Sequence, residues 1–149
     1  MDWPLLDVLP EASRRELLAR ARRRKFARQE VLFHEGDPGD SLHLVARGHV
    51  ALRIHTPLGD VATMRILRPG EFFGELAVVS PGPRNATAAA LDAVETIAID
   101  RELLAELRAE HPRIEAIILE AVVMEVRRLA QQVVEAMYVP VDKRVWRRI

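Results

Sequence analysis

The chain is 149 residues long, enough for one domain with a hydrophobic core. Its 22 basic and 22 acidic residues cancel to a formal charge of zero, so no overall field points to nucleic acid or to a membrane surface. The absence of cysteine excludes disulfides, thiolate catalysis and cysteine-ligated iron–sulfur clusters.

No uninterrupted apolar run approaches the ~20 residues that span a bilayer, and the N-terminus lacks a basic segment followed by an apolar one. We therefore expect a soluble, cytoplasmic protein without a membrane partner, which the lack of cysteine also favours. Basic residues cluster over residues 14–28 and again over 143–148. We interpret the first cluster as the solvated face of a helix.

The first predicted element is a helix over residues 10–23, in which Ser13 can cap the start. Its apolar residues recur at helical spacing: Leu17, Leu18 and Ala21. The apolar residues just ahead of this helix are expected to pack as a lid: Trp3, Leu5 and Leu6.

Between residues 26 and 100 the pattern changes to short apolar runs separated by turn residues. In one of them Val50, Leu52 and Ile54 alternate with other residues, which is typical of a half-buried strand. The predicted strands cover residues 30–33, 41–46, 49–55, 61–67 and 94–99. Many short strands at close spacing favour an antiparallel β-roll or jelly roll, so the predicted fold class is α+β, mainly β.

Two further helices are predicted after the strands, over residues 100–110 and 112–138. Pro112 suits the first turn of the second helix, and Pro140 ends its pattern. The second helix would be roughly 40 Å long at 1.5 Å per residue.

This long helix carries two neighbouring apolar stripes. One consists of Leu119, Val122, Val126, Leu129, Val133 and Ala136, and the other of Leu119, Val123, Val126, Ala130, Val133 and Met137. A lone surface helix needs one stripe, so two stripes indicate two packing partners. We expect one side to pack on the chain's own strands and the other on the same helix of a second subunit, with the first stripe as the dimerisation set. The alternative is a helix buried within a monomer.

A motif over residues 67–90 organises the chain, and its parts suit a small cyclic phosphate. Gly74 lets the backbone approach a ligand closely. A helical turn starting at Glu75 would present free N–H groups to an anion. Arg84 could hold the phosphate by a forked pair of hydrogen bonds, and Glu75 could accept a ribose hydroxyl proton.

This motif resembles the phosphate-binding cassette of the cyclic-nucleotide-binding domain superfamily. The match consists of Gly74-Glu75-Leu76-Ala77, an eight-residue spacer from Leu76 to Pro83, and then Arg84, Ala86 and Thr87. The alternative is a surface turn with an incidental Glu and Arg. Apolar and turn positions of the superfamily's β-roll continue the resemblance at Val31, Gly36, Asp37, Asp40, Leu42, Leu44, Gly48, Val50, Leu67, Gly70 and Phe73.

The last residues look like the hinge and first helix that lead to a winged helix-turn-helix in the CRP/FNR family of bacterial transcription regulators. Val141, Val145 and Ile149 begin an amphipathic pattern that is not completed. By this resemblance residues 1–111 form a nucleotide-binding β-roll with its N-terminal helix, 112–138 a dimerisation helix, and 139–149 the hinge. We expect a chain truncated before the module that contacts DNA.

The resemblance implies an allosteric sensor that binds a cyclic nucleotide, with cAMP favoured and cGMP possible, and relays binding through the long helix. The implied ligand-binding set is Phe73, Gly74, Glu75, Leu76, Ala77, Arg84, Asn85, Thr87, Gln131 and Gln132. Asn85 departs from the Ser, Thr or Ala common after the arginine, although its amide can still donate to a phosphate oxygen. Thr87 either bonds the ligand or fills a strand position, and Gln131 and Gln132 either contact adenine or are exposed. The alternative function is a dimerisation or interaction module of the same fold that binds no nucleotide.

Other chemistry finds little support in the sequence. A cupin-like metal site needs a His-x-His pair, which does not occur among His34, His43, His49 and His55. The serines Ser13, Ser41 and Ser80 do not lie in a Gly-x-Ser-x-Gly elbow. We therefore expect neither a metal site nor an enzyme.

Overall fold

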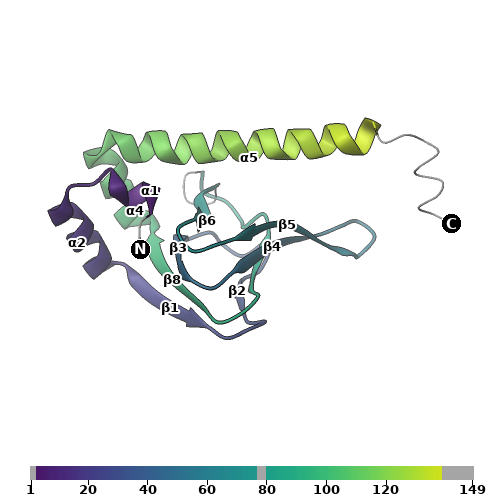
Figure 1. Cartoon of the computed structure of the whole chain (residues 1–149), viewed down its shortest axis with the longest axis horizontal. Coiled ribbons are helices and arrows are strands. Elements are labelled where there is room, and N and C mark those ends of the chain that lie inside the picture. The colour runs from purple at the N-terminus through teal and green to yellow at the C-terminus, as the bar shows by residue number, and fades with distance from the viewer. Residues whose placement is uncertain (1–2, 77–79, 139–149) are drawn as a thin grey trace.

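The computed structural model describes residues 3–76 and 80–138 and contains four labelled helices and eight strands (Figure 1). The helices are α1 (Pro4–Asp7), α2 (Glu11–Arg20), α4 (Arg101–Glu110) and α5 (Pro112–Tyr138). The strands are β1 (Arg22–Phe26), β2 (Val31–Phe33), β3 (Ser41–Arg47), β4 (Val50–His55), β5 (Val61–Leu67), β6 (Phe72–Phe73), β7 (Thr87–Ala90) and β8 (Val94–Asp100). The predicted fold class, an antiparallel β-roll with an N-terminal helix and a long C-terminal helix, is confirmed.

The strands form two antiparallel four-stranded sheets, ordered β1-β8-β3-β6 and β2-β7-β4-β5. Apolar side chains from both sheets fill the space between them: Phe26, Leu32, Val45, Val50, Leu67, Phe73, Ala88, Ala90 and Val94. This is the inner core of the roll. The two strands within the 67–90 motif, β6 and β7, therefore lie in different sheets, on opposite walls of one roll.

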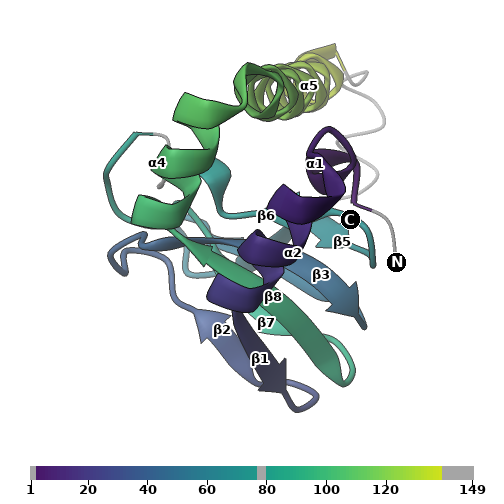
Figure 2. The same ribbon diagram turned by 90° about the vertical axis from the view of Figure 1, so that its left-hand side faces the viewer.

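A second core lies between the helices and the outer face of β3 and β8 (Figure 2). Leu42 and Leu44 of β3 belong to this outer core, whereas Val45 belongs to the inner one. Five consecutive residues of β3 are buried because both of its faces are covered. The predicted apolar lid is confirmed as buried, and the indole Nε1 of Trp3 donates to the carbonyl oxygen of Val45 at 3.0 Å.

The last two helices begin and end where the sequence predicted. Asp100 caps α4 by accepting a hydrogen bond from the amide of Leu103 at 2.8 Å. Arg108 of α4 pairs with Glu115 of α5 across the junction between them. From this junction α5 runs over the roll and extends past it, as Figure 1 shows.

The N-terminal prediction was wrong at its end. The helix predicted over residues 10–23 stops at Arg20, and Arg22 begins β1, whose first four residues are exposed. The basic cluster is therefore shared between a helix and an edge strand, although it is solvated as expected. Strands β6 and β7 were also missed, the former because it has two residues and the latter because it is rich in alanine.

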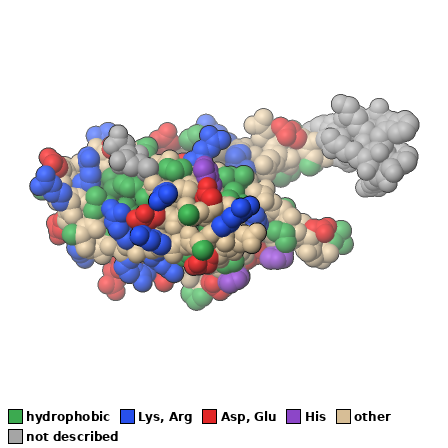
Figure 3. Space-filling model, turned by 60° about the horizontal axis from the view of Figure 1, so that its bottom comes forward, with side chains coloured by type: hydrophobic (Ala, Val, Ile, Leu, Met, Phe, Trp, Pro, Cys, Tyr) green, Lys and Arg blue, Asp and Glu red, His purple; other side chains and the backbone are tan. Residues whose placement is uncertain are grey.

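Charges of both signs are interspersed on the surface. Lys and Arg side chains lie beside Asp and Glu side chains across the face shown in Figure 3. Several pairs are close, including Arg20–Glu106 at 2.6 Å and Arg23–Glu95 at 3.0 Å. Within residues 3–76 and 80–138, no helix combines the length and apolar character needed to cross a bilayer.

Leu104→Ala is expected to lower the free energy of unfolding by about 2–5 kcal/mol. Leu104 is fully buried in the outer core, so its truncation leaves a cavity between α4 and the sheet. Urea unfolding followed by circular dichroism would measure the change. Leu58→Ala is the control, because Leu58 is 90% exposed and its loss should cost less than about 0.5 kcal/mol.

Candidate functional site

The 67–90 motif folds as a tight turn that brings its charged residues to one end of the roll. After β6, Gly74 adopts a positive φ of 85°. A Cβ at this position would lie 2.6 Å from Nη1 of Arg84, so glycine is needed here for space as well as for backbone conformation. Glu75 and Leu76 then begin a helical turn, as predicted.

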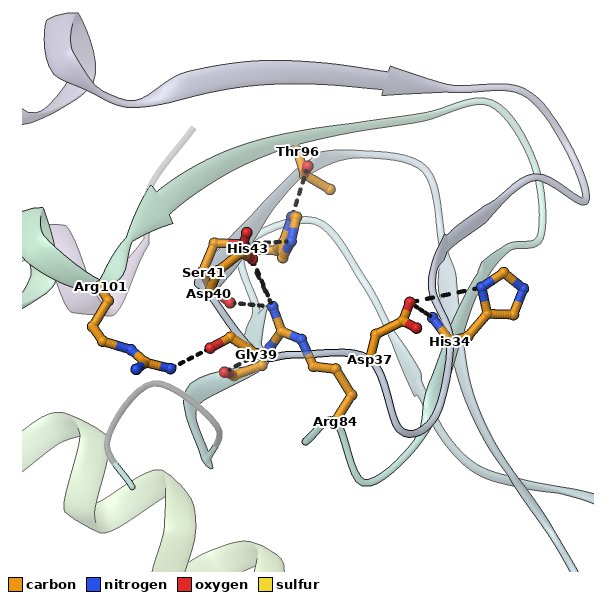
Figure 4. A network of polar contacts seen from close by, with 10 residues as sticks. His34, Asp37, Gly39, Asp40, Ser41, His43, Arg84, Thr96 and Arg101 are labelled. Carbon is orange, nitrogen blue, oxygen red and sulfur yellow. Dashed lines mark hydrogen bonds and ion pairs between the residues drawn. The ribbon is translucent and has the colours of Figure 1, made fainter. Parts of the chain in front are cut away.

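Arg84 is 4% exposed, and protein oxygens hold its guanidinium (Figure 4). Its Nη1 donates to the carbonyl oxygen of Gly74 at 3.0 Å, and its Nη2 donates to the carbonyl oxygen of Ser41 at 2.6 Å. Asp40 lies 3.7 Å from Nη2 and supplies a negative charge. The guanidinium is thus fixed from two strands that are distant in sequence.

The third nitrogen of the guanidinium, Nε, differs from the other two. The Nε of Arg84 is buried and has no hydrogen-bond partner among residues 3–76 and 80–138. The guanidinium carbon lies 4.1 Å from the centre of the Phe33 ring, and burial is the main factor that lowers the pKa of Arg84. A buried donor without a partner costs free energy, so this edge of Arg84 is suited to an anionic acceptor.

The backbone around Arg84 is joined to the segment that precedes β3. The amide of Arg84 donates to the carbonyl oxygen of Asp37 at 2.7 Å, and the amide of Gly36 donates to the carbonyl oxygen of Arg84 at 2.8 Å. The amide of Gly39 donates to the carbonyl oxygen of Gly82 at 3.2 Å. These bonds fix the position of the Arg84 backbone, from which its side chain extends into the roll.

Glu75 is also buried, at 8% exposure, and it lines a cavity together with Arg84. Burial is the largest factor that raises the pKa of Glu75, and the charge of Glu125 adds to this effect. Arg65 and Arg84 oppose it. A carboxylate held in this setting is an acceptor for a neutral donor such as a hydroxyl group.

Arg84 and Glu75 both line one cavity of about 60 Å³, which lies between the roll and α5. Its other lining residues are Phe33, Leu52, Met64, Arg65, Phe73, Gly74, Leu76, Asn85, Ala86, Glu125 and Leu129. The wall is mainly apolar away from its four charged residues, Arg65, Glu75, Arg84 and Glu125. The volume accommodates about four water molecules at ~15 Å³ each.

Polar contacts hold α5 over this cavity. Arg128 donates from Nη1 to the carbonyl oxygen of Met64 in β5 at 2.8 Å. Arg128 also pairs with Glu125, and Glu125 lies 3.6 Å from Arg65. The central part of α5 therefore closes the cavity through contacts that a shift of the helix would break.

Comparison with known proteins agrees with this geometry. The family model for the cyclic nucleotide-binding domain matches residues 23–111. This chain belongs to the cyclic nucleotide-binding domain family. The match includes both sheets and the cassette and ends just before α5.

The relatives of this cyclic nucleotide-binding domain include CRP-like regulators. The CRP-like cAMP-activated global transcriptional regulator of Mycobacterium tuberculosis is 30% identical over 124 residues, which cover 83% of this chain and 55% of that protein. The crystal structure of the Thermus thermophilus catabolite activator protein has a TM-score of 0.77 and 31% identity, covering 90% of this chain and 62% of that one. The N-terminal domain of a Streptomyces coelicolor transcriptional regulator has a TM-score of 0.68 and 35% identity, covering 87% and 90%.

The structure brings most of the predicted cassette residues of this cyclic nucleotide-binding domain together around the cavity. These are Phe73, Gly74, Glu75, Leu76, Arg84 and Asn85. Ala77 lies outside the described residues. The hydroxyl oxygen of Thr87, at the start of β7, accepts a hydrogen bond from the amide of Glu35 at 2.9 Å. Its hydroxyl can still donate, so a contact of Thr87 with a ligand stays a prediction.

The two glutamines of α5 are exposed, and their proposed contact with a base stays a prediction. Gln131 lies beside Glu75 along a separate, open groove. Gln132 follows Glu125 and Leu129 at i+7 and i+3, which places it on the same face of α5. Of the two glutamines, Gln131 is the one that shares a groove with Arg65, Glu75 and Glu125, three residues that also line the cavity.

Several lining residues of this cyclic nucleotide-binding domain were not predicted from the sequence. Ser41, which contacts Arg84 and does not line the cavity, contributes a carbonyl oxygen that no side-chain pattern indicates. Leu129 was assigned to dimerisation but lines the cavity, whereas Leu119, Val126 and Val133 of the same stripe are exposed. Arg65 of β5 and Glu125 of α5 lie 3.6 Å apart. In the sequence, only their positions within an apolar-rich strand and an apolar-rich helix distinguished these two residues.

His43 lies behind Arg84 and is buried in the inner face of β3. Its ring stacks on Phe73, and its two nitrogens lie 3.3 Å from the hydroxyl of Ser41 and 3.2 Å from that of Thr96 (Figure 4). Burial, together with the positive charge of Arg84, lowers the pKa of His43 to about 3. Within residues 3–76 and 80–138, no group of three or more His, Cys, Asp or Glu side chains is placed to hold a metal ion.

The pKa of His43 predicts a loss of stability in mild acid. The unfolded chain protonates this residue below about pH 6.5, whereas the folded chain keeps it neutral down to about pH 3. The free energy of unfolding should therefore fall as the pH decreases through this window, by about 2 kcal/mol between pH 7 and pH 5 from this residue alone.

His43→Gln tests this origin, because glutamine can keep the hydrogen bonds to Ser41 and Thr96 but does not titrate. Urea unfolding at pH 7, 6 and 5 would give the pH dependence of both proteins. Between pH 7 and pH 5, the free energy of unfolding of His43→Gln should fall by about 2 kcal/mol less than that of the parent. Equal slopes would assign the acid sensitivity to the carboxylates instead.

Proposed function

We propose that this chain is the sensory and dimerisation domain of a CRP/FNR-like transcription regulator, with cAMP as its allosteric ligand. The observation that carries the proposal is the buried Arg84 guanidinium beside the cavity, whose Nε lacks a partner in the part of the cassette that the structure describes. A cyclic phosphate would supply the acceptor that this donor lacks. The name of the M. tuberculosis relative, a cAMP-activated regulator, supports cAMP as the nucleotide.

The remaining lining residues suit the other parts of a nucleotide. Glu75 would accept a hydrogen bond from a ribose hydroxyl, and its carboxylate would repel a second phosphate. Leu52, Met64 and Leu129 would contact the faces of a purine. The amide of Asn85 would donate to a phosphate oxygen, in place of the small residue usual at this position.

The lining of the cavity supports a relay through α5. Glu125 and Leu129 of α5 line this cavity, which adjoins a groove of about 590 Å³ that shares Arg65, Glu75 and Glu125 with it, so we propose that a purine nucleotide bound here displaces this part of α5 from the roll. Such movement would break the contacts of Arg128 with Met64 and of Glu125 with Arg65. The ligand would thus favour a second arrangement of α5 through its differential affinity for the two arrangements.

The exposed apolar side chains of α5 support the proposed homodimer. Five residues of the second stripe are large and exposed in a single chain: Leu119, Val123, Val126, Val133 and Met137. In the first stripe, Val122 packs against the outer core and Leu129 lines the cavity. The surface for a second copy is therefore proposed to be the second stripe, with Val126 near its centre.

The proposal divides the chain into residues 1–111 for sensing, 112–138 for dimerisation and relay, and 139–149 as a hinge, which lies outside the described residues. The chain spans about half the length of the M. tuberculosis regulator that it matches. In the complete regulator, a shift of paired α5 helices would reorient DNA-binding modules beyond the hinge. DNA is thus a proposed partner of the complete regulator and not of residues 1–138.

Calorimetric titration of the purified chain with cAMP, and with cGMP in parallel, tests the proposal. Saturable binding at micromolar concentrations or tighter would support the sensor, and the ratio of the two affinities would give the base preference. Absence of heat with both nucleotides, together with an unchanged melting temperature, would contradict it.

One observation favours the alternative, an interaction module of the same fold without a nucleotide. Two of the three nitrogens of the Arg84 guanidinium already bond the carbonyl oxygens of Gly74 and Ser41, so Arg84 has a structural role that needs no ligand. In that case the exposed stripe of α5 would mediate self-association while neither nucleotide bound. The same titration, with sedimentation of the chain, separates the two functions.

A further inference from the structure

The segment of residues 39–41 lies between Arg84 and the start of α4. On one side Ser41 accepts hydrogen bonds from Nη2 of Arg84, through its carbonyl oxygen at 2.6 Å and its hydroxyl at 3.4 Å. Asp40 adds an ion pair with the same nitrogen at 3.7 Å. Much of the guanidinium's orientation therefore depends on where this segment lies.

Arg101, the first residue of α4, holds the other side of this segment (Figure 4). Its guanidinium donates to the carbonyl oxygen of Gly39, and its backbone amide donates to that of Asp40 at 3.1 Å. Ser41 is paired in register with Asp100, the cap of α4. One residue thus binds two successive carbonyl groups directly before the residue that orients Arg84.

We propose that Arg101 is a positioning residue for Arg84: by fixing residues 39–41 it couples α4 to the phosphate site. No contact between Arg101 and a ligand is involved. The path consists of the Arg101–Gly39 and Arg101–Asp40 bonds, the rigid backbone to Ser41, and the Ser41–Arg84 bonds. The ligand half of this proposal rests on the proposed function, whereas the effect on Arg84 does not.

The packing of α4 connects this coupling to α5. Leu103, Leu104 and Leu107 of α4 share the outer core with Ile114 and Ile118 of α5. Movement of α5 on ligand binding would therefore displace α4, and α4 would act on residues 39–41 through Arg101. The Ser41–Arg84 bonds are present without a ligand, so weakening Arg101 should alter the phosphate site even in the ligand-free protein.

The test measures Arg84 directly and cAMP affinity separately. The Nε–H signal of Arg84 in a ¹⁵N–¹H spectrum of the ligand-free protein can be assigned by its loss in Arg84→Lys. Arg101→Ala removes the guanidinium bond but keeps the backbone amide, and Arg101→Lys retains a donor. Arg108→Ala is the matched control, because Arg108 lies on α4 and pairs with Glu115 without touching residues 39–41.

We expect Arg101→Ala to shift or broaden the Arg84 signal and to weaken cAMP binding about threefold to tenfold. Arg101→Lys should recover part of both effects, and Arg108→Ala should change neither. An Arg84 signal that moves no further in Arg101→Ala than in Arg108→Ala would overturn the proposal. A shifted signal with unchanged cAMP affinity would overturn the coupling. If the parent binds neither nucleotide, the proposed function is contradicted. The Nε–H signal of Arg84 still shows in that case whether Arg101 positions Arg84.

Discussion

Arg84→Ala is expected to weaken cAMP binding roughly tenfold to 150-fold. The substitution removes the charge-assisted bonds to the cyclic phosphate, which contribute about 1.5–3 kcal/mol. It also leaves the carbonyl oxygens of Gly74 and Ser41 without their donor, so some loss of stability is expected as well. Calorimetric titration gives the affinity, and thermal unfolding gives the stability.

Two further variants separate binding from folding. Arg84→Lys keeps a positive charge but cannot form the planar fork, so its affinity should lie between those of Arg84→Ala and the parent. Arg53→Ala removes an arginine of β4 that lines a different cavity and should leave the affinity unchanged. If Arg84→Ala binds cAMP as tightly as the parent, the phosphate is not bound at Arg84.

Val126→Glu is expected to abolish self-association of the chain at concentrations where the parent is dimeric. Val126 is 59% exposed in the single chain and lies in the middle of the second stripe of α5. In a two-fold symmetric helix pair the substitution occurs on both subunits, so two like charges would enter an apolar interface. The dissociation constant should rise by at least about 100-fold, and sedimentation velocity would measure it.

Met124→Glu is the matched control. Met124 is 62% exposed on the same helix but lies outside the stripe, beside the open groove lined by Phe72 and Arg127. It should leave the dimer intact, and both variants should keep the helical circular dichroism of the parent. A parent that sediments as a monomer at high concentration would contradict the proposed dimer.

The features that could be predicted from the sequence are those carried by periodicity and by local spacing. The heptad-like pattern of α5 and the alternation in β4 gave correct elements, since each depends on side chains that face one way. The cassette was identified because the residue types and the spacing from Gly74-Glu75 to Arg84 together resemble the motif of a known family. Both charged residues do line one cavity.

The features that were missed depend on contacts between distant segments. Strand β1 has four exposed basic residues and a single buried one, Phe26, so it has no alternation to detect. Strand β7 consists largely of alanine, which favours helices when considered alone. The carbonyl of Ser41 and the closure of the cavity by Glu125 depend on where β3 and α5 lie, and a single sequence does not give those positions.

The basic composition of β1 has a consequence for how molecules of this protein behave towards one another. β1 lies at the edge of its sheet, so one side of its backbone has no neighbouring strand within the described roll. Edge strands invite pairing with other chains, and such pairing leads to aggregation. Arg22, Arg23, Arg24 and Lys25 are all exposed there. Two copies of β1 laid edge to edge would bring like charges opposite each other, so the repulsion protects this edge from unwanted strand addition.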